Sequence, residues 1–300
     1  MDTRDALDCL VVGAGPAGLT AGMYLRRFHR LVLVVDGGDA RALRIPRSHN
    51  VPGFPQGIPG PELIDRLQQQ YAEVGGHITR ARVNQVLRRP EDGLFQVLVG
   101  GETVLAKTVL LATGALDHEP QMPGLADLRE RGLLRQCPIC DGFEFTGRCI
   151  GVIGAGAHGA RESLFIRHFS ERLWFIGTHG LEEVDGVLAA RLHEAGVRCV
   201  QGRPVSADTT DNGRVRLCMD DGSEHHFDVL YAALGCHPRA ELGTALGARR
   251  DHGGNLVIDH HCRTGIEGLY AAGDVTGGLD QIVVATGQAA IAATAIHNSL

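Results

Sequence analysis

Apolar residues along the chain fall into two similar series of short runs. At 9–27, "CLVVGAGPAGLTAGMYLRR" places an apolar run of strand length before a GxGxxG turn and an amphipathic helix, and a second apolar run, "LVLVVD", follows. The same order recurs at 149–177, where "CIGVIGAGAHGARESLFIRHF" precedes "RLWFIG". Short apolar runs on either side of a helical period indicate a β–α–β unit, so the pattern predicts two copies of one unit.

Each unit is followed by a segment with strand-like alternation. Residues 94–112 alternate like the strands of a β-hairpin and run into "LLATGA", and residues 214–235 have a similar pattern that ends in "LYAALG". The Pro/Gly-rich stretch 49–63 predicts a loop. Near the C-terminus, "IVVATGQAAIAATAI" predicts a packed helix because Gly and Gln interrupt its apolar character.

These elements predict an α/β fold. We expect two Rossmann-like, three-layer ββα dinucleotide-binding domains, one inserted into the other. Polar, proline-containing joints at 114–123 and 235–241 are the expected crossovers. The outer domain would comprise 1–115 and 241–300, and the inserted domain 116–240.

Three glycines in the first unit have the spacing that a phosphate-binding turn requires. Gly13 allows the tight turn out of the strand, Gly15 lets backbone N–H groups approach a pyrophosphate, and Gly18 allows the helix and strand to pack closely. The second unit repeats the spacing with Gly154, Gly156 and Gly159. One GxGxxG is a weak signal because glycine-rich turns are common, but two copies in the same context predict two dinucleotide-binding units.

The two units differ at the position that recognises an adenosine ribose. Asp36 ends the second apolar run of the first unit, where a carboxylate hydrogen-bonds the ribose. The corresponding residue of the second unit is Gly177, followed by "THGLEEV". This segment has no arginine for a 2′-phosphate, and Glu182 and Glu183 would repel one. The second unit therefore has a phosphate cradle without a ribose contact.

Composition and charge exclude several classes of function. The 300 residues carry a formal net charge of -6, so there is no excess of basic residues for nucleic acid or an anionic membrane. The first residues, "MDTRDALDC", place acids where a secretion signal has a basic region, and no apolar stretch reaches the roughly 20 residues that span a bilayer. We therefore expect a cytoplasmic protein with no membrane span and no nucleic-acid partner.

Eight cysteines are present, and two of them have a chemically useful spacing. Cys137 and Cys140 lie in "QCPICDGF". The other six occur singly, at positions 9, 149, 199, 218, 236 and 262. We expect Cys9, Cys149 and Cys199, which lie in apolar runs, to be buried core residues. Structural disulfides among these six are not expected in a reducing compartment.

The pair at 137 and 140 allows three interpretations. A zinc site needs four ligands, and the sequence has no second CxxC or suitably spaced Cys/His pair; the "DHHC" at 259–262 is interpreted as a chance match, so no metal site is predicted. A static disulfide across two residues closes too small a loop to stabilise much. A redox-active pair is favoured, because Pro138 suits the first position of a helix whose dipole would lower a thiol pKa.

The order of these motifs resembles the low-molecular-weight thioredoxin reductase family of flavoproteins, over essentially the whole chain. The resemblance is carried by "GAGPAG" at 13–18, "NVPGFP" at 50–55, "ATGA" at 112–115, "CPICDG" at 137–142, "GAGAHGA" at 154–160 and "AAGDV" at 271–275. It implies a homodimeric, FAD-dependent disulfide oxidoreductase. The first unit and the C-terminal segment would bind FAD, and the inserted unit would bind the nicotinamide cofactor and carry the redox pair.

The resemblance also assigns residues to each cofactor. The FAD-binding set would be Gly13, Gly15, Ala17, Gly18, Asp36, Asn50, Thr113, Gly114, Gly273, Asp274 and Gln281, and the nicotinamide nucleotide would lie on Gly154, Gly156 and Gly159. Gln281 would open the C-terminal helix, with Asp280 as its N-cap. The N-terminus of that helix would stabilise negative charge on the reduced flavin.

The resemblance implies three catalytic residues. Cys140 would lie nearest the flavin, Cys137 would exchange with the substrate, and Asp141 would move protons. The alternative interpretation of Asp141 is an acid at a helix start that matches the dipole. His158, inside the second glycine turn, could contact a phosphate, fill the nicotinamide site or face solvent.

Two enzymatic functions and one non-enzymatic function follow. The first is a reductase of a thioredoxin-like protein disulfide or a small disulfide, with NAD(P)H possible at a degenerate site. The second is an FAD-dependent dithiol oxidase that uses oxygen or another electron acceptor. The third is an FAD-bound redox sensor, which the retained Cys137, Cys140 and Asp141 disfavour.

Overall fold

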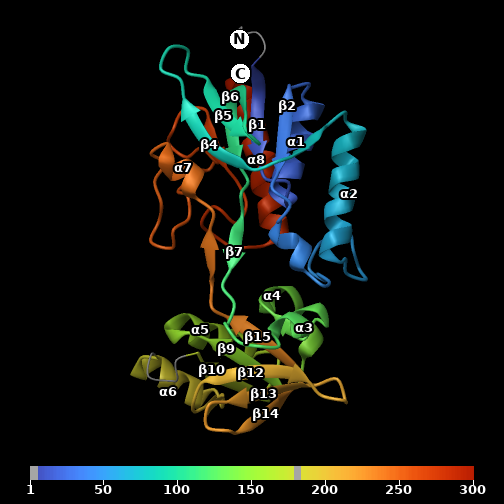
Figure 1. Ribbon diagram of the computed structural model, residues 1–300, viewed down its shortest axis with the longest axis vertical. Helices are drawn as coiled ribbons and strands as arrows, with labels where there is room; N and C mark the ends of the chain where they lie inside the picture. The colour runs from blue at the N-terminus through green and yellow to red at the C-terminus, as the bar shows by residue number, and fades with distance from the viewer. Residues whose placement is uncertain (1–5, 179–183) are drawn as a thin grey trace. The chain divides into compact units, whose positions relative to one another are not determined.

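The computed structural model describes residues 6–178 and 184–300. The chain forms two compact units (Figure 1): Met1–Leu116 with His237–Leu300, and Asp117–Cys236. It crosses from one unit to the other in β7 (Ala115–Asp117) and β16 (Cys236–Pro238). Which cofactor each unit binds stays a prediction.

The first unit is built on a sheet with the strand order β3-β2-β1-β6-β5-β4. Its strands are β1 (Leu7–Val12), β2 (Val32–Asp36), β3 (Ile78–Arg80), β4 (Val83–Arg88), β5 (Phe95–Val99), β6 (Glu102–Leu111) and β17 (Leu269–Ala271), which pairs with β6. The strands β3, β2, β1 and β6 are parallel, whereas β4, β5 and β6 form an antiparallel meander. Strand β6 joins the two parts, because residues 106–111 pair with β1 and residues 102–106 pair with β5.

Side chains of β1 alternate between two cores. Cys9 and Val11 face the helices α1 (Pro16–Arg27), α2 (Gly60–Glu73) and α8 (Ile282–Ser299), which cover one side of the sheet (Figure 1). Leu10 and Val12 face the other way, toward Phe95 and the remaining apolar residues of the antiparallel strands. Helices on one face and a β-layer on the other give the predicted three-layer arrangement. The short helices of this unit are η2 (Arg41–Arg44) and α7 (Glu241–Ala245).

The second unit repeats this plan. Its parallel sheet has the strand order β11-β10-β9-β15-β8. The strands are β8 (Leu134–Arg135), β9 (Ile150–Gly154), β10 (Leu173–Gly177), β11 (Arg198–Val200) and β15 (Val229–Ala233). Helices α5 (Gly156–Ile166) and α6 (Gly186–Glu194) pack on one face. Helix α3 (Leu125–Glu130) and the antiparallel strands β12 (Pro204–Thr209), β13 (Val215–Met219) and β14 (Glu224–Phe227) pack on the other. The prediction of two Rossmann-like units in an α/β fold is confirmed.

Three local predictions have mixed outcomes. The C-terminal helix is present as α8, but residues 60–63, predicted as loop, form the first turn of α2. Proline is favourable in a first helical turn because no intrahelical partner exists there for the N–H it lacks, and Pro61 occupies that turn. Cys9 and Cys149 are buried as predicted, whereas Cys199 is exposed because β11 is an edge strand. Among the described residues, no helix is both long and apolar enough to cross a membrane.

Candidate functional site

The first glycine turn joins β1 to α1 with little room for side chains. Gly13 has a left-handed backbone (φ +110°), and a Cβ there would overlap the carbonyl oxygen of Ala112. A Cβ on Gly18 would overlap the carbonyl oxygen of Gly13, so the helix and the strand touch at these two glycines. A Cβ on Gly15 would meet only the Cβ of Ala40, at 3.9 Å. The turn is therefore tight where helix meets strand and open at Gly15.

The N-terminus of α1 is suited to an anion. The helix has 12 residues, begins with Pro16 after the N-cap Gly15, and has no acidic side chain in its first turn. Unpaired N–H groups and the helix dipole favour negative charge at this position. Together with the open side of Gly15, this arrangement fits a diphosphate.

Asp36 ends β2 and is 7% exposed. One carboxylate oxygen accepts a hydrogen bond from the backbone N–H of Gly38 at 2.9 Å, and the other accepts from the guanidinium of Arg80, its partner in the β2–β3 register. These bonds fix the carboxylate at the end of the strand. An ionised carboxylate has about four lone-pair sites, so capacity remains for a ribose hydroxyl.

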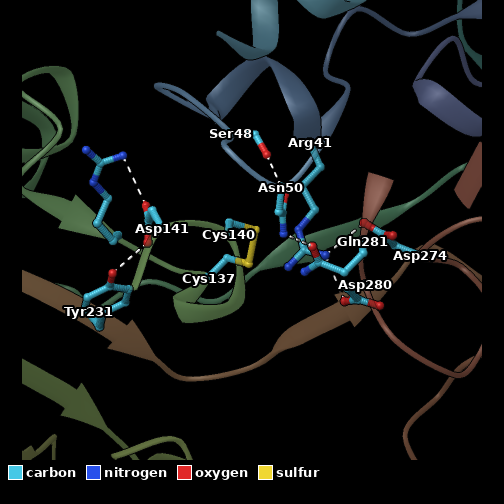
Figure 2. The surroundings of a disulfide bond; sticks show 11 residues. Arg41, Ser48, Asn50, Cys137, Cys140, Asp141, Tyr231, Asp274, Asp280 and Gln281 are labelled. Carbon is cyan, nitrogen blue, oxygen red and sulfur yellow. Dashed lines mark hydrogen bonds and ion pairs between the residues drawn. A yellow bond between two sulfur atoms is a disulfide. The ribbon is translucent and has the colours of Figure 1, made fainter. Parts of the chain in front are cut away.

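Two further pairs of predicted residues are brought together. Asn50 donates from Nδ2 to Oε1 of Gln281 at 2.8 Å (Figure 2), and the hydroxyl of Ser48 donates to Oδ1 of Asn50 at 2.7 Å. A Cβ on Gly273 would lie 3.0 Å from the Cβ of Ala17, so the turn after β17 contacts the start of α1. The described structure thus places these predicted residues next to each other or next to the first glycine turn.

Thr113 and Gly114 follow β6. The hydroxyl of Thr113 donates to the backbone carbonyl of Arg239 at 2.7 Å, which ties the end of β6 to the returning chain. Gly114 has a left-handed backbone (φ +69°), and a Cβ there would meet no atom within 4 Å. Gly114 is therefore required by backbone conformation, and the space beside it is open.

Arg41 is part of a cluster that the sequence reasoning missed. Its Nη1 bonds to carboxylate oxygens of Asp274 at 2.9 Å and Asp280 at 2.8 Å (Figure 2). The predicted N-cap role of Asp280 is wrong: Gln281 is the N-cap of α8, and the carboxylate of Asp280 is directed to Arg41 instead. No motif in the sequence points to Arg41, because the pairing depends on two segments more than 230 residues apart.

Gln288 was also missed, although the sequence carried a signal for it. Its Oε1 accepts hydrogen bonds from the backbone N–H of Gly273 at 2.8 Å and from the hydroxyl of Thr276 at 3.2 Å. A single glutamine in an apolar helix is the kind of residue that hydrogen-bonds inward. It holds the glycine turn after β17 against α8.

The residues of the first unit fit the adenosine diphosphate half of FAD. The fit rests on the open helix N-terminus at Gly15, the fixed carboxylate of Asp36 and the close approach of Gly273 to Ala17. A diphosphate requires hydrogen-bond donors such as the N–H groups at a helix start, and a ribose hydroxyl requires an acceptor such as a carboxylate. The individual contacts of this set with FAD stay a prediction.

The second glycine turn repeats the close packing of the first. A Cβ on Gly154 would lie 2.7 Å from the Cα of Gly159, and a Cβ on Gly159 would lie 2.6 Å from the Cα of Gly154. Gly156 has a left-handed backbone (φ +46°) and begins α5, whose first turn has no acidic residue. The close helix–strand contact that a phosphate-binding turn requires is therefore present in this unit as well.

The strand that follows this turn ends differently from β2. Strand β10 ends at Gly177, and the backbone N–H of Thr178 donates to the carbonyl of Gly154 at 3.0 Å. Gly177 cannot supply a carboxylate to a ribose. Glu182 and Glu183, which were expected to repel a 2′-phosphate, lie outside the described residues.

His158 lies in the first turn of α5, and its ring is next to the turn that follows β15. Its Nε2 is 3.3 Å from a carboxylate oxygen of Glu162 and 3.8 Å from the position of a Cβ on Gly235. Its side chain is 57% exposed, so the ring covers the turn and also reaches solvent. The hydrogen bond to Glu162 raises the pKa of His158.

Cys137 and Cys140 form a disulfide across the single helical turn α4 (Pro138–Asp141), with Cα atoms 5.3 Å apart (Figure 2). Cys137 is the N-cap, Pro138 takes the first helical position as predicted, and the backbone N–H of Cys140 donates to the carbonyl of Cys137 at 3.0 Å. A helix of four residues has a small dipole, so the predicted dipole effect on a thiol pKa has little support.

The three buried thiols, Cys9, Cys149 and Cys262, are poorly suited to redox exchange. Burial raises the pKa of Cys9 to about 12 and that of Cys262 to about 11, and it also raises the pKa of Cys149. Thiols with raised pKa values have little nucleophilic thiolate at neutral pH. Among the described cysteines, Cys137 and Cys140 are the two that form a disulfide.

Asp141 follows the pair directly and is 8% exposed. Its Oδ1 accepts a hydrogen bond from the hydroxyl of Tyr231 at 2.6 Å, and its Oδ2 lies 3.3 Å from Nη1 of Arg135. Figure 2 shows the carboxylate directed toward Tyr231, on the side away from the two sulfurs. Neither interpretation of Asp141 from the sequence anticipated these two partners.

No metal centre is found in the part of the chain that the structure describes. Within 6–178 and 184–300, no three or more His, Cys, Asp or Glu side chains are grouped as metal ligands.

Comparisons with known proteins agree with this geometry. The profile of the family described as "Pyridine nucleotide-disulphide oxidoreductase" matches residues 7–289. The thioredoxin reductase of Treponema pallidum (strain Nichols) is 30% identical over 297 residues, which cover 96% of this chain and 95% of that protein. The crystal structure of HlmI superposes with a TM-score of 0.90 at 27% identity, covering 99% of this chain and 93% of that one. The thioredoxin reductase of Streptococcus pyogenes MGAS5005 superposes with a TM-score of 0.89 at 25% identity, covering 99% and 98%.

Proposed function

The chain belongs to the pyridine nucleotide-disulphide oxidoreductase family, and from this premise we propose that it is a thioredoxin reductase-like flavoprotein that passes electrons between FAD and an external disulfide or dithiol. Family membership makes it an FAD-dependent disulfide oxidoreductase. The observation that carries the finer proposal is the Cys137–Cys140 disulfide on a single turn, with the buried Asp141 next in sequence.

Each of these residues has a proposed role. Cys137 is the sulfur that exchanges with the substrate, Cys140 is the sulfur nearest the flavin, and Asp141 handles protons. Bound FAD would supply the two-electron chemistry that side chains lack. Gly13, Gly15, Gly18 and Asp36 would hold its adenosine diphosphate half.

The nicotinamide site of the second unit is proposed to be degenerate. Three observations support this: the unit keeps the glycine cradle, its second strand ends on Gly177, and the ring of His158 lies over the turn at Gly235. NADPH and NADH would keep diphosphate contacts and lose ribose recognition.

A dithiol oxidase is the second candidate, and Gly177 is the observation that favours it. In this direction a substrate dithiol becomes a disulfide while the Cys137–Cys140 disulfide becomes two thiols. The two electrons and two protons then pass to oxygen or another acceptor. A weak nucleotide site suits this reaction because no nicotinamide donor is needed.

The partner follows from the exchange chemistry. We propose a thioredoxin-like protein disulfide, or a small disulfide or dithiol, as the substrate, with the enzyme acting as a homodimer in the cytoplasm. The relatives named thioredoxin reductase support the first of these.

The first test is the identity of the flavin. Purified protein should be yellow and should release FAD, not FMN, because the first unit fits an adenosine diphosphate. Colourless protein that cannot be reconstituted with FAD would contradict the proposal.

The second test separates reductase from oxidase. Oxygen uptake is measured with a small dithiol, and disulfide reduction is measured with NADPH or NADH. Sustained oxygen uptake with dithiol, without nucleotide-dependent reduction of a disulfide, would favour the oxidase. The reverse result would favour the reductase.

A further inference from the structure

The redox turn is tied to the edge of the second sheet through one carboxylate. Arg135 on β8 and Tyr231 on β15 are direct partners in the parallel β8–β15 register. Strand β8 ends two residues before Cys137, and Asp141 follows Cys140. Both strand residues reach Asp141: the hydroxyl of Tyr231 at 2.6 Å and Nη1 of Arg135 at 3.3 Å. The two strands therefore hold the far end of the turn that carries the disulfide.

An aromatic ring packs against the cluster. Tyr231 is 0% exposed and Asp141 is 8% exposed. The guanidinium of Arg135 lies 5.4 Å from the ring centroid of Phe145, and that ring meets the ring of Tyr231 edge to face at 6.3 Å. A buried ionised carboxylate is costly unless it is paired and hydrogen-bonded, and here one donor is cationic and the other is a hydroxyl.

The charges around the cluster favour one protonation state. Burial, then the negative charge of Asp141 and its hydrogen bond, raise the pKa of Tyr231, so the hydroxyl stays protonated and donates. Glu144 on η3 (Gly142–Phe145) is a further negative group that acts in the same direction on Tyr231. The guanidinium of Arg135 carries only hydrogen-bond donors. Both partners thus suit a carboxylate at Asp141 that accepts two bonds.

We propose that Arg135 and Tyr231 are positioning residues that hold Asp141 as an ionised carboxylate and fix the redox turn to the sheet. The inference rests on the proposed function, because it assumes that the pair at 137 and 140 undergoes dithiol–disulfide exchange. The two side chains set the pH below which exchange slows as Asp141 takes up a proton. On protonation, the carboxyl group loses its ion pair with Arg135.

The test is the pH dependence of disulfide exchange in the FAD-loaded protein. The oxidised protein reacts with dithiothreitol from about pH 3.5 to pH 8, and thiols are trapped with a maleimide and counted by mass. The exchange rate of each variant is divided by the wild-type rate at the same pH, because the ionisation of dithiothreitol then cancels. Tyr231→Phe removes the hydroxyl that donates to Asp141 and keeps the buried ring, so the variant should fold.

Tyr231→Phe should displace the acidic limb of the profile upward by about one pH unit, since a hydrogen bond to a charged group is worth about that much. The exchange rate of Tyr231→Phe relative to wild type should therefore fall as the pH is lowered and become constant at neutral pH. Arg135→Gln should produce a larger displacement than Arg135→Lys, which retains the charge. Tyr71→Phe is the matched control, because Tyr71 is a fully buried tyrosine in the core of the first unit; its ratio should stay constant with pH.

The possible results distinguish the positioning role of Arg135 and Tyr231 from the proposed function. If wild type exchanges normally and Tyr231→Phe gives a pH-independent ratio, as Tyr71→Phe does, the positioning role is wrong and the proposed function stands. If the wild-type disulfide resists dithiothreitol at every pH, the proposed function fails and this inference fails with it. If Arg135→Gln does not fold, the result with Tyr231→Phe alone settles the positioning role.

Discussion

The two glycine turns of this chain share a close contact between helix and strand, and they differ in the residue that ends the next strand. In the first, a Cβ on Gly18 would lie 1.8 Å from the carbonyl oxygen of Gly13; in the second, a Cβ on Gly159 would lie 2.6 Å from the Cα of Gly154. The first unit then ends its second strand on Asp36, whereas the second ends on Gly177. Close packing of helix on strand is required by the fold, whereas the carboxylate of Asp36 is proposed to serve a ligand. The comparison teaches that the close glycine contact can be present without a carboxylate at the end of the next strand.

A second contrast concerns the chemistry that each unit carries. The described residues of the second unit hold the Cys137–Cys140 disulfide, whereas Cys9 and Cys262 in the first are buried thiols with raised pKa values. We therefore expect cofactor retention to depend on the first unit and sulfur chemistry on the second.

The largest expected effect comes from the redox pair. Cys140→Ser should reduce dithiol–disulfide turnover to background while flavin stays bound, because exchange needs both sulfurs. Turnover and the flavin absorbance are measured on the same preparation. Cys218→Ser is the control, since Cys218 is a partly buried free thiol of the same unit. Equal loss in both variants would show that the pair is not special.

The glycine contacts allow the two units to be disturbed separately. Gly18→Ala and Gly159→Ala each force a Cβ against backbone, so each should lower the free energy of unfolding by about 1–3 kcal/mol. Gly18→Ala should also lose flavin, and Gly159→Ala should retain it. Thermal unfolding and filtration of bound flavin measure the two effects.

Gly287→Ala is the matched control for these glycines. A Cβ at this position in α8 would meet no atom within 4 Å, so the change should be neutral or stabilise by about 0.5–1 kcal/mol. Loss of flavin in Gly159→Ala alone would reverse the assignment of FAD to the first unit.

Asp36 tests the ribose contact directly. Asp36→Asn should weaken FAD binding by about 10- to 100-fold, because a hydrogen bond to a charged acceptor contributes about 1.5–3 kcal/mol. Affinity is measured by titrating FAD into apoprotein. Asp65→Asn, an exposed carboxylate on α2, should leave the affinity unchanged. Unchanged affinity in Asp36→Asn would mean that the carboxylate serves only Gly38 and Arg80.

The smallest expected effect is at His158. The hydrogen bond to Glu162 raises the pKa of His158 in the folded protein. The ion pair therefore stabilises the fold fully below the unfolded pKa of about 6.5, and this stabilisation is lost as the pH rises through the folded pKa. Glu162→Gln should lower the pKa of His158 and cost less than about 1 kcal/mol at low pH, since the ring is half-exposed. NMR titration of the histidine ring protons measures the shift. Glu241→Gln, which breaks the His237 pair, should not affect His158.

Much of the fold could be predicted because it depends on local periodicity. The apolar runs that became β1, β9 and β10 have few alternative conformations once a glycine turn and an amphipathic helix lie beside them. Cys199 was misjudged because its run forms an edge strand, and neighbouring strands cannot be counted from a short sequence window.

The site was predicted where it is contiguous in sequence and missed where it is not. The CxxC pair and its proline are adjacent, so their turn could be inferred. Tyr231 lies 90 residues from Asp141, and no pattern links them. Asp280 was assigned as an N-cap from its residue preference, but its ion pair with Arg41 overrides that preference. Long-range polar pairing is determined by the packed structure and not by local sequence.

The most direct test of the difference between the two glycine turns is anaerobic bleaching of the flavin band by NADPH, by NADH and by a small dithiol, in separate titrations. Without a ribose carboxylate or an arginine clamp, NADPH should bind at least roughly a hundredfold worse than in an arginine-bearing relative, and NADH should be no worse than NADPH. The dithiol should bleach the band at stoichiometric amounts. Rapid, stoichiometric bleaching by micromolar NADPH would contradict the account and make this an ordinary NADPH-dependent reductase.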